Sequence, residues 1–357
     1  MGSTLIIAEA GVNHNGSLDL ARRLVDVAAD AGADAIKFQT FRASQLVSRH
    51  AQKARYQQQT TGADESQLAM IQKLELSESD HGTLADHCRS RGIRFLSTPF
   101  DLQSLAMLVA LDVAPIKISS GDVTHEQLLH AVGATNRPAI LSTGMSTLAE
   151  VEAALAVLAS GYLAATGESL SATEAYRVSA GQAALRARVT LLHCTTEYPA
   201  PVETVNLRAM QTMREAFGLP VGYSDHTLGN SVPLAAVALG ATVVEKHFTL
   251  DRGMEGPDHR ASLEPAELVN LVNGIRAVET ALGNPRKIPS AAEIPNIPVA
   301  RRSLVATRAI GRGERFDTTN LGAKRPGTGI SAMRYSEWLG RTAYRDYEED
   351  ALIEDTP

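Results

Sequence analysis

The sequence predicts an α/β protein, a TIM-type (β/α)8 barrel followed by a small β-rich domain. Short runs rich in isoleucine and valine alternate with longer segments of helical periodicity, as in successive βα units around a parallel sheet. Each run is apolar at its centre, which is typical of strands covered on both faces. The runs are Thr4–Ala8, Ala35–Phe38, Arg94–Ser97, Ile116–Ser119, Ala139–Leu141, Val189–His193, Val221–Tyr223 and Val243–Lys246.

Helical segments follow several of these strands. Ser17 and Ser79 are predicted to open the first two helices, and Thr147 with Glu150 matches a capping box. An open, doubly wound sheet is the competing fold, but Ala10–Gly16 lacks the glycine pattern of a dinucleotide-binding or phosphate-binding loop. The predicted helices are Ser17–Ala31, Ser79–Arg91, Leu102–Leu111, Thr147–Ala159 and Leu234–Leu239.

Two domains are predicted, a barrel over residues 1–282 and a second domain over 299–357. Residues 283–298 are dense in proline and glycine and indicate a linker. Within the barrel, Arg42–Leu76 and Ser160–Arg188 depart from the βα rhythm. We expect both segments to lie outside the barrel wall.

The second domain is expected to be small and rich in β-structure. Ser303–Thr307 and Gly311–Phe316 are its predicted strands, and Arg325-Pro326-Gly327 is a predicted turn. Residues 301–345 hold ten Lys or Arg against three acids. This basic set is either a solvated charged face or a surface that meets an anionic ligand.

Composition restricts the classes of partner. The 357 residues carry a net charge of −6 and only 4% aromatic residues, which argues against nucleic-acid binding. Cys88 and Cys194 are too few for a disulfide framework, and no apolar stretch approaches the roughly 20 residues that span a membrane. The amino terminus has no signal-peptide pattern. We therefore expect a cytoplasmic protein with a small-molecule partner and no membrane partner.

Polar residues stand at the carboxyl end of nearly every predicted strand, where barrel enzymes build their sites. Lys37 and Lys117 leave buried strands, and an unpaired ammonium there is costly, so an anionic ligand is expected beside the nearby hydroxyls. Turn formation explains single cases but not the whole set. The set comprises Glu9, Lys37, Gln39, Thr98, Lys117, Ser120, Ser142, His193, Thr196, Tyr198, Ser224, His226 and His247.

Two of these histidines are candidates for a metal site. His226 and His247 end adjacent strands, so both rings can reach one divalent ion and leave positions open for substrate oxygens. A single histidine at a strand end is more often a core or capping residue than a metal ligand. Two histidines on adjacent strands together favour metal binding. Glu9, between two alanines, would be partly desolvated and suits a general acid or base, or else a partner for a lysine.

These residues lie in motifs through which the chain resembles the sialic acid synthase family, along nearly its whole length. The carboxyl-terminal segments Arg301–Leu304 and Lys324–Ile330 resemble that family's antifreeze-like (SAF) domain. The barrel motifs are Ile7–Gly16 (IAEAGVNHNG), Ile36–Thr40 (IKFQT), Ser97–Phe100 (STPF), Lys117–Gly121 (KISSG), Leu141–Met145 (LSTGM), His193–Pro199 (HCTTEYP), Ser224–Thr227 (SDHT), Glu245–Thr249 (EKHFT) and Gly256–His259 (GPDH).

The resemblance implies roles for particular residues. The metal ligands would be His226 and His247, and the active-site glutamate would be Glu9. Arg325 would reach the sugar of a partner subunit, which implies a domain-swapped homodimer. The phosphoenolpyruvate site would comprise Lys37, Thr98, Lys117, Ser120, Ser142, Thr196 and Ser224, and the sugar site Gln39, Asp122, Tyr198, Asp258 and Arg325. Two of these depart from familiar members, since Asp122 stands where some have glutamate and Thr196 where some have asparagine.

The implied activity is a metal-dependent condensation of phosphoenolpyruvate with open-chain N-acetylmannosamine, giving N-acetylneuraminate and phosphate by carbon–oxygen cleavage. The implied ion is manganese, with magnesium or cobalt as alternatives. A second reading is a legionaminic or pseudaminic acid synthase that uses a diacetamido-trideoxyhexose. More distant readings are a condensing enzyme for phosphorylated sugars, which would lack the carboxyl-terminal domain, and a non-catalytic sugar-binding module.

Overall fold

The computed structural model describes residues 2–53, 57–58 and 65–355. The chain separates into two compact units, Met1–Gly283 and Asn284–Pro357. Of the predicted excursion Arg42–Leu76, residues 54–56 and 59–64 lie outside the described residues. In the described parts of the chain, no helix has both the length and the apolar character that crossing a membrane requires.

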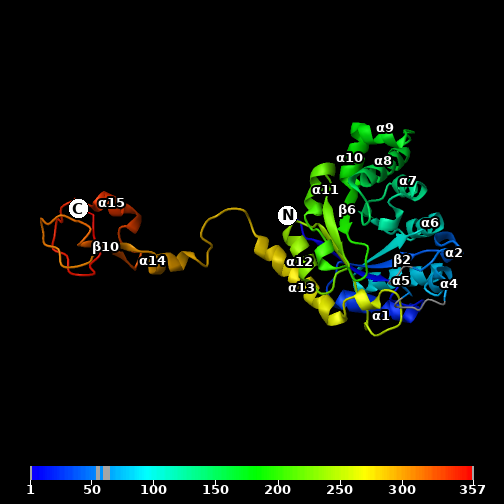
Figure 1. Cartoon of the computed structure of the whole chain (residues 1–357), viewed down its shortest axis with the longest axis horizontal. Helices are drawn as coiled ribbons and strands as arrows, with labels where there is room; N and C mark the ends of the chain where they lie inside the picture. The colour runs from blue at the N-terminus through cyan, green and yellow to red at the C-terminus, as the bar shows by residue number, and fades with distance from the viewer. Residues whose placement is uncertain (1, 54–56, 59–64, 356–357) are drawn as a thin grey trace. The chain divides into compact units, whose positions relative to one another are not determined.

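The first unit is a barrel of eight parallel strands, as predicted (Figure 1). The hydrogen-bonded order is β3-β2-β1-β8-β7-β6-β5-β4, and the end strands β3 and β4 also lie against each other. Since β1 pairs with both β2 and β8, the sheet curls around one core and all carboxyl ends meet at one mouth. The strands are β1 (Leu5–Gly11), β2 (Ala35–Thr40), β3 (Arg94–Pro99), β4 (Ile116–Ile118), β5 (Ala139–Ser142), β6 (Val189–Cys194), β7 (Val221–Asp225) and β8 (Val243–His247).

Helices form the outer layer of this unit. Ser17 accepts a hydrogen bond from the Leu20 amide, and Thr147 forms the predicted capping box with Glu150. The described helices are α1 (Leu18–Asp30), α2 (Ala43–Leu46), α4 (Gln67–Gln72), α5 (Glu78–Arg91), α6 (Leu102–Ala110), α7 (Glu126–Ala134), α8 (Leu148–Ala164), α9 (Ala172–Arg177), α10 (Ser179–Arg188), α11 (Ala209–Phe217), α12 (Ser231–Ala238) and α13 (Pro265–Leu282).

Two predicted helix starts are wrong. Helix α12 begins at Ser231, three residues before the predicted Leu234. Helix α5 begins at Glu78, not at Ser79, because Ser77 is its N-cap. The Ser77 hydroxyl accepts from the Asp80 amide, and the Asp80 carboxylate accepts from the Ser77 amide at 2.9 Å. This reciprocal capping box satisfies two amides that would otherwise lack partners, so it sets the first turn.

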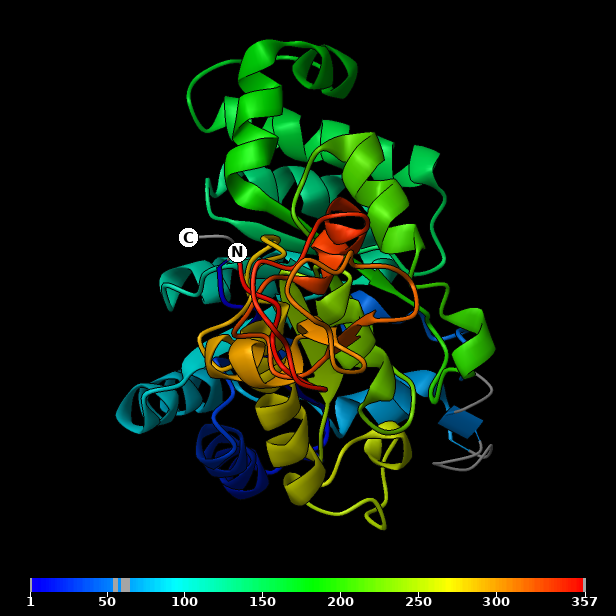
Figure 2. The ribbon, with the colours of Figure 1, turned by 90° about the vertical axis from the view of Figure 1, so that its left-hand side faces the viewer.

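The segment Ser160–Arg188 lies outside the barrel wall, as predicted. Helix α8 continues past the predicted end at Ala159, and α9 and α10 pack against α8. In Figures 1 and 2 this green segment lies at the top of the barrel unit, beyond the strands. It therefore extends the helical layer without contributing to the mouth.

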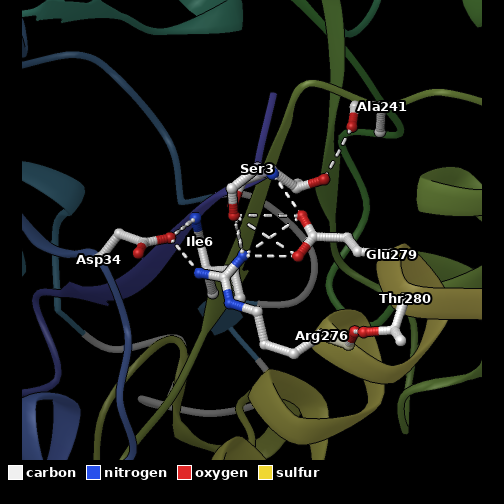
Figure 3. A network of polar contacts seen from close by, with 8 residues as sticks. Ser3, Ile6, Asp34, Ala241, Arg276, Glu279 and Thr280 are labelled. Carbon is white, nitrogen blue, oxygen red and sulfur yellow. Dashed lines mark hydrogen bonds and ion pairs between the residues drawn. The ribbon is translucent and has the colours of Figure 1, made fainter. Parts of the chain in front are cut away.

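The amino-terminal end of the barrel is closed by a polar network around Arg276 of α13 (Figure 3). The Arg276 guanidinium donates to Asp34 at 2.7 Å and to Ser3 at 2.7 Å, and it pairs with Glu279 at 3.1 Å. Asp34 also accepts from the Ile6 amide at 2.7 Å. The network therefore ties α13 to the segments where β1 and β2 begin.

The second unit is a small domain with its own core. Strands β9 (Ser303–Ala306) and β10 (Leu321–Lys324) pair antiparallel, and α14 (Ile297–Ala300) and α15 (Tyr335–Trp338) are its short helices. The core packs Phe316 against Trp338 and Tyr347, with ring centroids 5.7 and 5.9 Å apart.

The predicted strand Gly311–Phe316 is not a strand. Gly313 has a φ of +89°, and the Glu314 amide bonds back to the Gly311 carbonyl at 3.0 Å. A turn therefore occupies the segment, and Leu321–Lys324 pairs with β9 in its place. Much of the basic set is ion-paired at the surface, for example Arg308 with Glu314 and Arg345 with Glu354.

Candidate active site

The predicted strand-end residues converge because of register and alternation. On β8, Glu245 and His247 are two positions apart and share one face of the strand. Glu9 pairs in register with both Lys37 and His247, and Ser224 pairs with Glu245. Neighbouring strands therefore present these groups to the same space inside the mouth.

Two lysines and two glutamates form the centre of the site. Lys37 Nζ lies 2.8 Å from Glu9 Oε2 and 3.7 Å from Glu245 Oε2. Lys117 Nζ lies 3.5 Å from Glu245 Oε1, which also accepts from the Ser224 hydroxyl at 2.9 Å. All four charged side chains are at least 94% buried, so their charges act on one another with little screening by water.

Burial and charge separate the pKa values of this cluster. Burial raises the pKa of Glu9 to about 7, against the opposing effect of Lys37. Burial would also raise the pKa of Glu245, but the positive charges of Lys117 and Lys37 outweigh the effect of burial and lower this pKa to about 2. Burial lowers the pKa of Lys117, and Glu245 opposes this only in part. Burial also disfavours charged Lys37, but Glu245 and Glu9 outweigh it and raise the pKa of Lys37.

Small hydroxyl side chains lie at or just beyond the ends of β4, β5 and β6. Ser120 Oγ accepts from the Gly144 amide at 2.9 Å and lies 3.1 Å from Cys194 Sγ. A Cβ on Gly144 would come within 2.3 Å of Thr196 Oγ1, so glycine is needed for this close approach. Ser142 Oγ and Thr196 Oγ1 are buried without a hydrogen-bond partner among the described residues. Lys37 donates to Thr98 at 3.0 Å.

His226 and His247 lie together, with ring centroids 5.5 Å apart, and Tyr198 stacks 4.2 Å from His226. The Nδ1 of His226 is 2.6 Å from the Thr195 carbonyl. As donor there, Nδ1 leaves the Nε2 lone pair available to an ion. Burial lowers the pKa of both rings, which keeps them neutral as a metal ligand must be.

This donor set fits the predicted divalent ion. His247 Nδ1 is buried and has no hydrogen-bond partner in the described chain. Among the described residues, no group of three or more His, Cys, Asp or Glu is arranged to hold a metal. Two imidazoles would therefore be the protein's main contribution, with substrate oxygens completing the coordination.

A cavity of about 190 Å³ opens beside the histidines. Gln39, Tyr198, His247 and Asp258 line it, so three of the predicted sugar contacts lie together with one predicted metal ligand. Burial raises the pKa of Asp258 to about 6. Apolar residues line the cavity as well, most of them from the segment between β2 and α5 and from the end of β3.

Some predicted residues stand apart from this cavity. Asp122 is buried at the end of β4, where its Oδ1 lies 3.2 Å from His125 Nδ1. His193 bonds the Val205 carbonyl at 2.6 Å and makes none of the described contacts of the cluster. Arg325 belongs to the second unit, is exposed, and donates from Nε to the Ala300 carbonyl at 3.0 Å.

Two features of the site were missed at the level of sequence. Glu245, which pairs with both lysines, follows two valines, so the sequence pattern places it in the interior of a strand. Its position two residues before His247 on the same strand was the available signal, because alternate residues share a face. The other feature is the apolar part of the cavity lining, because Leu46, Met70, Ile71 and Leu74 come from the excursion Arg42–Leu76, which is expected to lie outside the barrel.

Comparison with known proteins gives consistent matches. Residues 24–287 match the NeuB family, and residues 301–356 match the SAF domain. The N,N'-diacetyllegionaminic acid synthase of Campylobacter jejuni subsp. jejuni serotype O:2 is 52% identical over 353 residues, 99% of each chain. The enzyme of the same name from Legionella pneumophila subsp. pneumophila is 46% identical over 335 residues, 94% of this chain and 89% of that one.

A solved structure is also similar. The N-acetylneuraminic acid (sialic acid) synthetase from Leptospira borgpetersenii serovar Hardjo-bovis, in complex with citrate, superposes with a TM-score of 0.67. It is 33% identical in sequence, and the match covers 83% of this chain and 90% of that one.

Proposed function

The chain belongs to the NeuB family and is an enzyme, and on that premise we propose that it condenses phosphoenolpyruvate with a diacetamido-trideoxyhexose to form a legionaminic-type acid and phosphate. The observation that carries the proposal is the pair of buried lysines beside unpartnered hydroxyls and two neutral histidines. Lys117 lies 3.5 Å from its carboxylate, and Ser142 and Thr196 lack partners among the described residues. Such a site has donors in reserve for a small anion.

Phosphoenolpyruvate would be held by the lysine end of the site. Lys37 and Lys117 provide the positive charge, and Ser142 and Thr196 provide free hydroxyl donors. Ser120 is already an acceptor from the Gly144 amide, so its own proton can go to a ligand oxygen. Thr98 and Ser224 hold Lys37 and Glu245 in position, which fixes the charge pattern before the ligand arrives.

His226 and His247 would hold the ion, for which we propose manganese, with magnesium or cobalt as the alternatives. When bound, such an ion acts as a Lewis acid on a carbonyl oxygen. The Thr195 carbonyl fixes the tautomer of His226, and Tyr198 packs against both rings with centroids 4.2 and 5.7 Å away. These contacts would orient the two imidazoles.

In the reaction, carbon 3 of phosphoenolpyruvate attacks the aldehyde carbon of the open-chain sugar. A water molecule adds to the cation that forms at carbon 2 and gives one proton to Glu9, which passes it to the former aldehyde oxygen to form the new hydroxyl group. The tetrahedral intermediate then breaks its carbon–oxygen bond to phosphate, and its remaining hydroxyl proton leaves with the phosphate, which forms the keto group. Glu9 lies at the end of β1 beside Lys37, so the same cluster that binds the anion can accept the proton.

We place the diacetamido-trideoxyhexose ahead of N-acetylmannosamine, the sugar expected first from the motifs. The names of the relatives at 52% and 46% identity, both N,N'-diacetyllegionaminic acid synthases, support this order.

We further propose a domain-swapped homodimer in which Arg325 serves the partner's site. Arg325 is exposed and forms no ion pair with the described residues. The first part of the second unit exposes Ile288, Ile294 and Val299, which a partner would cover.

Phosphate release from phosphoenolpyruvate tests the proposed reaction. We expect rapid release with the diacetamido-trideoxyhexose, slower release with N-acetylmannosamine and none with either sugar in its phosphorylated form. Faster turnover of N-acetylmannosamine would overturn the sugar assignment. Sugar binding without phosphate release in metal-loaded protein would favour the non-catalytic reading.

Mixing two inactive variants tests the swap. Arg325→Ala and His226→Ala are each expected to be inactive. The first variant keeps an intact barrel site, and the second keeps the Arg325 that a partner's site requires. After unfolding and joint refolding, random pairing should restore about a quarter of the wild-type activity if Arg325 acts across the dimer. No restoration, with heterodimers present by mass, would contradict the swap.

A further inference from the structure

The cavity beside His247 is lined by both polar and apolar residues. Its polar lining residues are Gln39, Gln57, Ser119, Tyr198, His247 and Asp258. Six apolar lining residues, here named the apolar wall, are Phe41, Leu46, Met70, Ile71, Leu74 and Phe100. A ligand in this cavity can therefore contact polar groups and hydrocarbon at the same time.

The apolar wall is a packed element of the fold. Phe41 and Leu74 are buried in one small cluster, and Leu46, Ile71 and Phe100 pack against it while part-exposed. The rings of Phe41 and Phe100 meet edge to face, with centroids 6.2 Å apart. The wall is thus built before ligand binds, and its part-exposed members are available to contact a ligand in the cavity.

We propose that the apolar wall selects the sugar by receiving the methyl groups at the end of the molecule farthest from its aldehyde. The inference rests on the proposed function, because it takes the aldehyde to lie beside His247. A diacetamido-trideoxyhexose carries a methyl group at carbon 6 and an acetyl methyl group on the nitrogen at carbon 4. N-acetylmannosamine has hydroxyl groups at both positions.

The difference between the two sugars matches the chemistry of the wall. Methyl groups gain by leaving water for a hydrocarbon surface. A hydroxyl placed there loses its hydrogen bonds to water, and none of the six side chains has a strong donor or acceptor to replace them. One methyl group in an apolar pocket changes kcat/KM by about 10-fold to 200-fold.

Replacing Ile71 by two residues of equal shape isolates the polarity of the wall. Ile71→Val and Ile71→Thr differ only by a methyl group exchanged for a hydroxyl. With the diacetamido-trideoxyhexose, kcat/KM of the Thr variant should be about 10-fold below that of the Val variant. With N-acetylmannosamine, kcat/KM should be nearly equal in the two variants. The ratio of kcat/KM for the diacetamido-trideoxyhexose to that for N-acetylmannosamine should therefore be smaller in the Thr variant than in the Val variant.

A second position covers the case in which Ile71→Thr folds poorly. Leu46→Asn alters the wall from a different helix, and Leu102→Asn is its control, since Leu102 is 47% exposed and does not line the cavity. Leu46→Asn should lower the ratio of kcat/KM for the diacetamido-trideoxyhexose to that for N-acetylmannosamine. The KM for phosphoenolpyruvate should stay at its wild-type value. Leu102→Asn should leave the preference unchanged.

The outcomes separate this inference from the proposed function. If the wild type prefers the diacetamido-trideoxyhexose but the preference survives both Ile71→Thr and Leu46→Asn, only the role of the wall is wrong. Equal losses for both sugars would also overturn it, because they indicate a structural role. If the wild type does not prefer the diacetamido-trideoxyhexose, the proposed function fails first.

Discussion

The two ends of the barrel use charged residues in opposite ways. At the amino-terminal end, Arg276 has Asp34, Ser3 and Glu279 all within 3.1 Å, and both terminal nitrogens of the guanidinium form hydrogen bonds (Figure 3). At the mouth, Lys37 pairs closely with Glu9 at 2.8 Å, whereas the ion pair of Lys117 with Glu245 is 3.5 Å long. The first network is held by short contacts within the protein, whereas the second leaves Lys117 loosely paired.

This difference separates stability from function. A polar network that satisfies all of its members stabilises the elements it joins. Buried hydroxyls and amines without close partners reduce stability, and they are retained where a ligand completes them. Variants at the mouth should therefore change mainly the kinetic constants, and variants at the amino-terminal end should change mainly the free energy of unfolding.

The largest loss of activity is expected from His226→Ala. Removal of one of two proposed ligands should lower kcat by about 10³-fold or more, because the carbonyl would lose its Lewis acid. Chelation of the wild type should have the same effect, and manganese should restore the wild type but not the variant. His87→Ala, on the outer helix α5, is the matched control. Full activity of His226→Ala in chelator would refute the metal assignment.

Lys117→Met should lower kcat/KM for phosphoenolpyruvate by about 10² to 10³-fold, because a charge aimed at the anion is lost. Its melting temperature should stay the same or rise, since a buried and loosely paired amine is costly. Calorimetric melting and steady-state kinetics measure the two effects. Lys287→Met, at an exposed position, should change neither. A large loss of stability in Lys117→Met would mean that the lysine is structural.

Ser142→Ala should have a smaller effect on activity. One hydrogen bond to a charged ligand contributes about 1.5–3 kcal/mol, so the KM for phosphoenolpyruvate should rise by about 10-fold or more. The free protein should not lose stability, because this hydroxyl has no hydrogen-bond partner among the described residues. Titration calorimetry with phosphoenolpyruvate checks the affinity directly. An unchanged affinity would remove Ser142 from the anion site.

Arg276→Met should have the smallest effect on catalysis and a clear effect on stability. We expect near-wild-type kinetic constants and a free energy of unfolding lower by about 1–2 kcal/mol, a modest value because the arginine is partly exposed. Urea unfolding measures this loss. A defect in kcat without a loss of stability would show that the two ends of the barrel are coupled.

The prediction from sequence succeeded where the signal was local. Each strand ended in polar residues, and eight strand-like runs predicted a barrel whose carboxyl ends meet, so Lys37, Lys117, His226 and His247 were found together. Glu245 escaped because its neighbours in sequence are apolar and only the alternation of β8 turns it into the mouth. The strand expected at Gly311–Phe316 failed because turn-forming glycines outweighed its β-prone residues.

By itself, the sequence determined the βα order, the helix caps at Ser17 and Thr147 and the family, because periodicity, capping and motifs are read from residues close along the chain. Only the tertiary structure decided which carboxylate each lysine shares and which residues line the cavity together with the sugar contacts. Lys37 and Glu245 are brought within 3.7 Å, and Ile71 lines the same cavity as Tyr198 and Asp258. These contacts depend on how the sheet closes and how the excursion after β2 folds back, which no local pattern specifies.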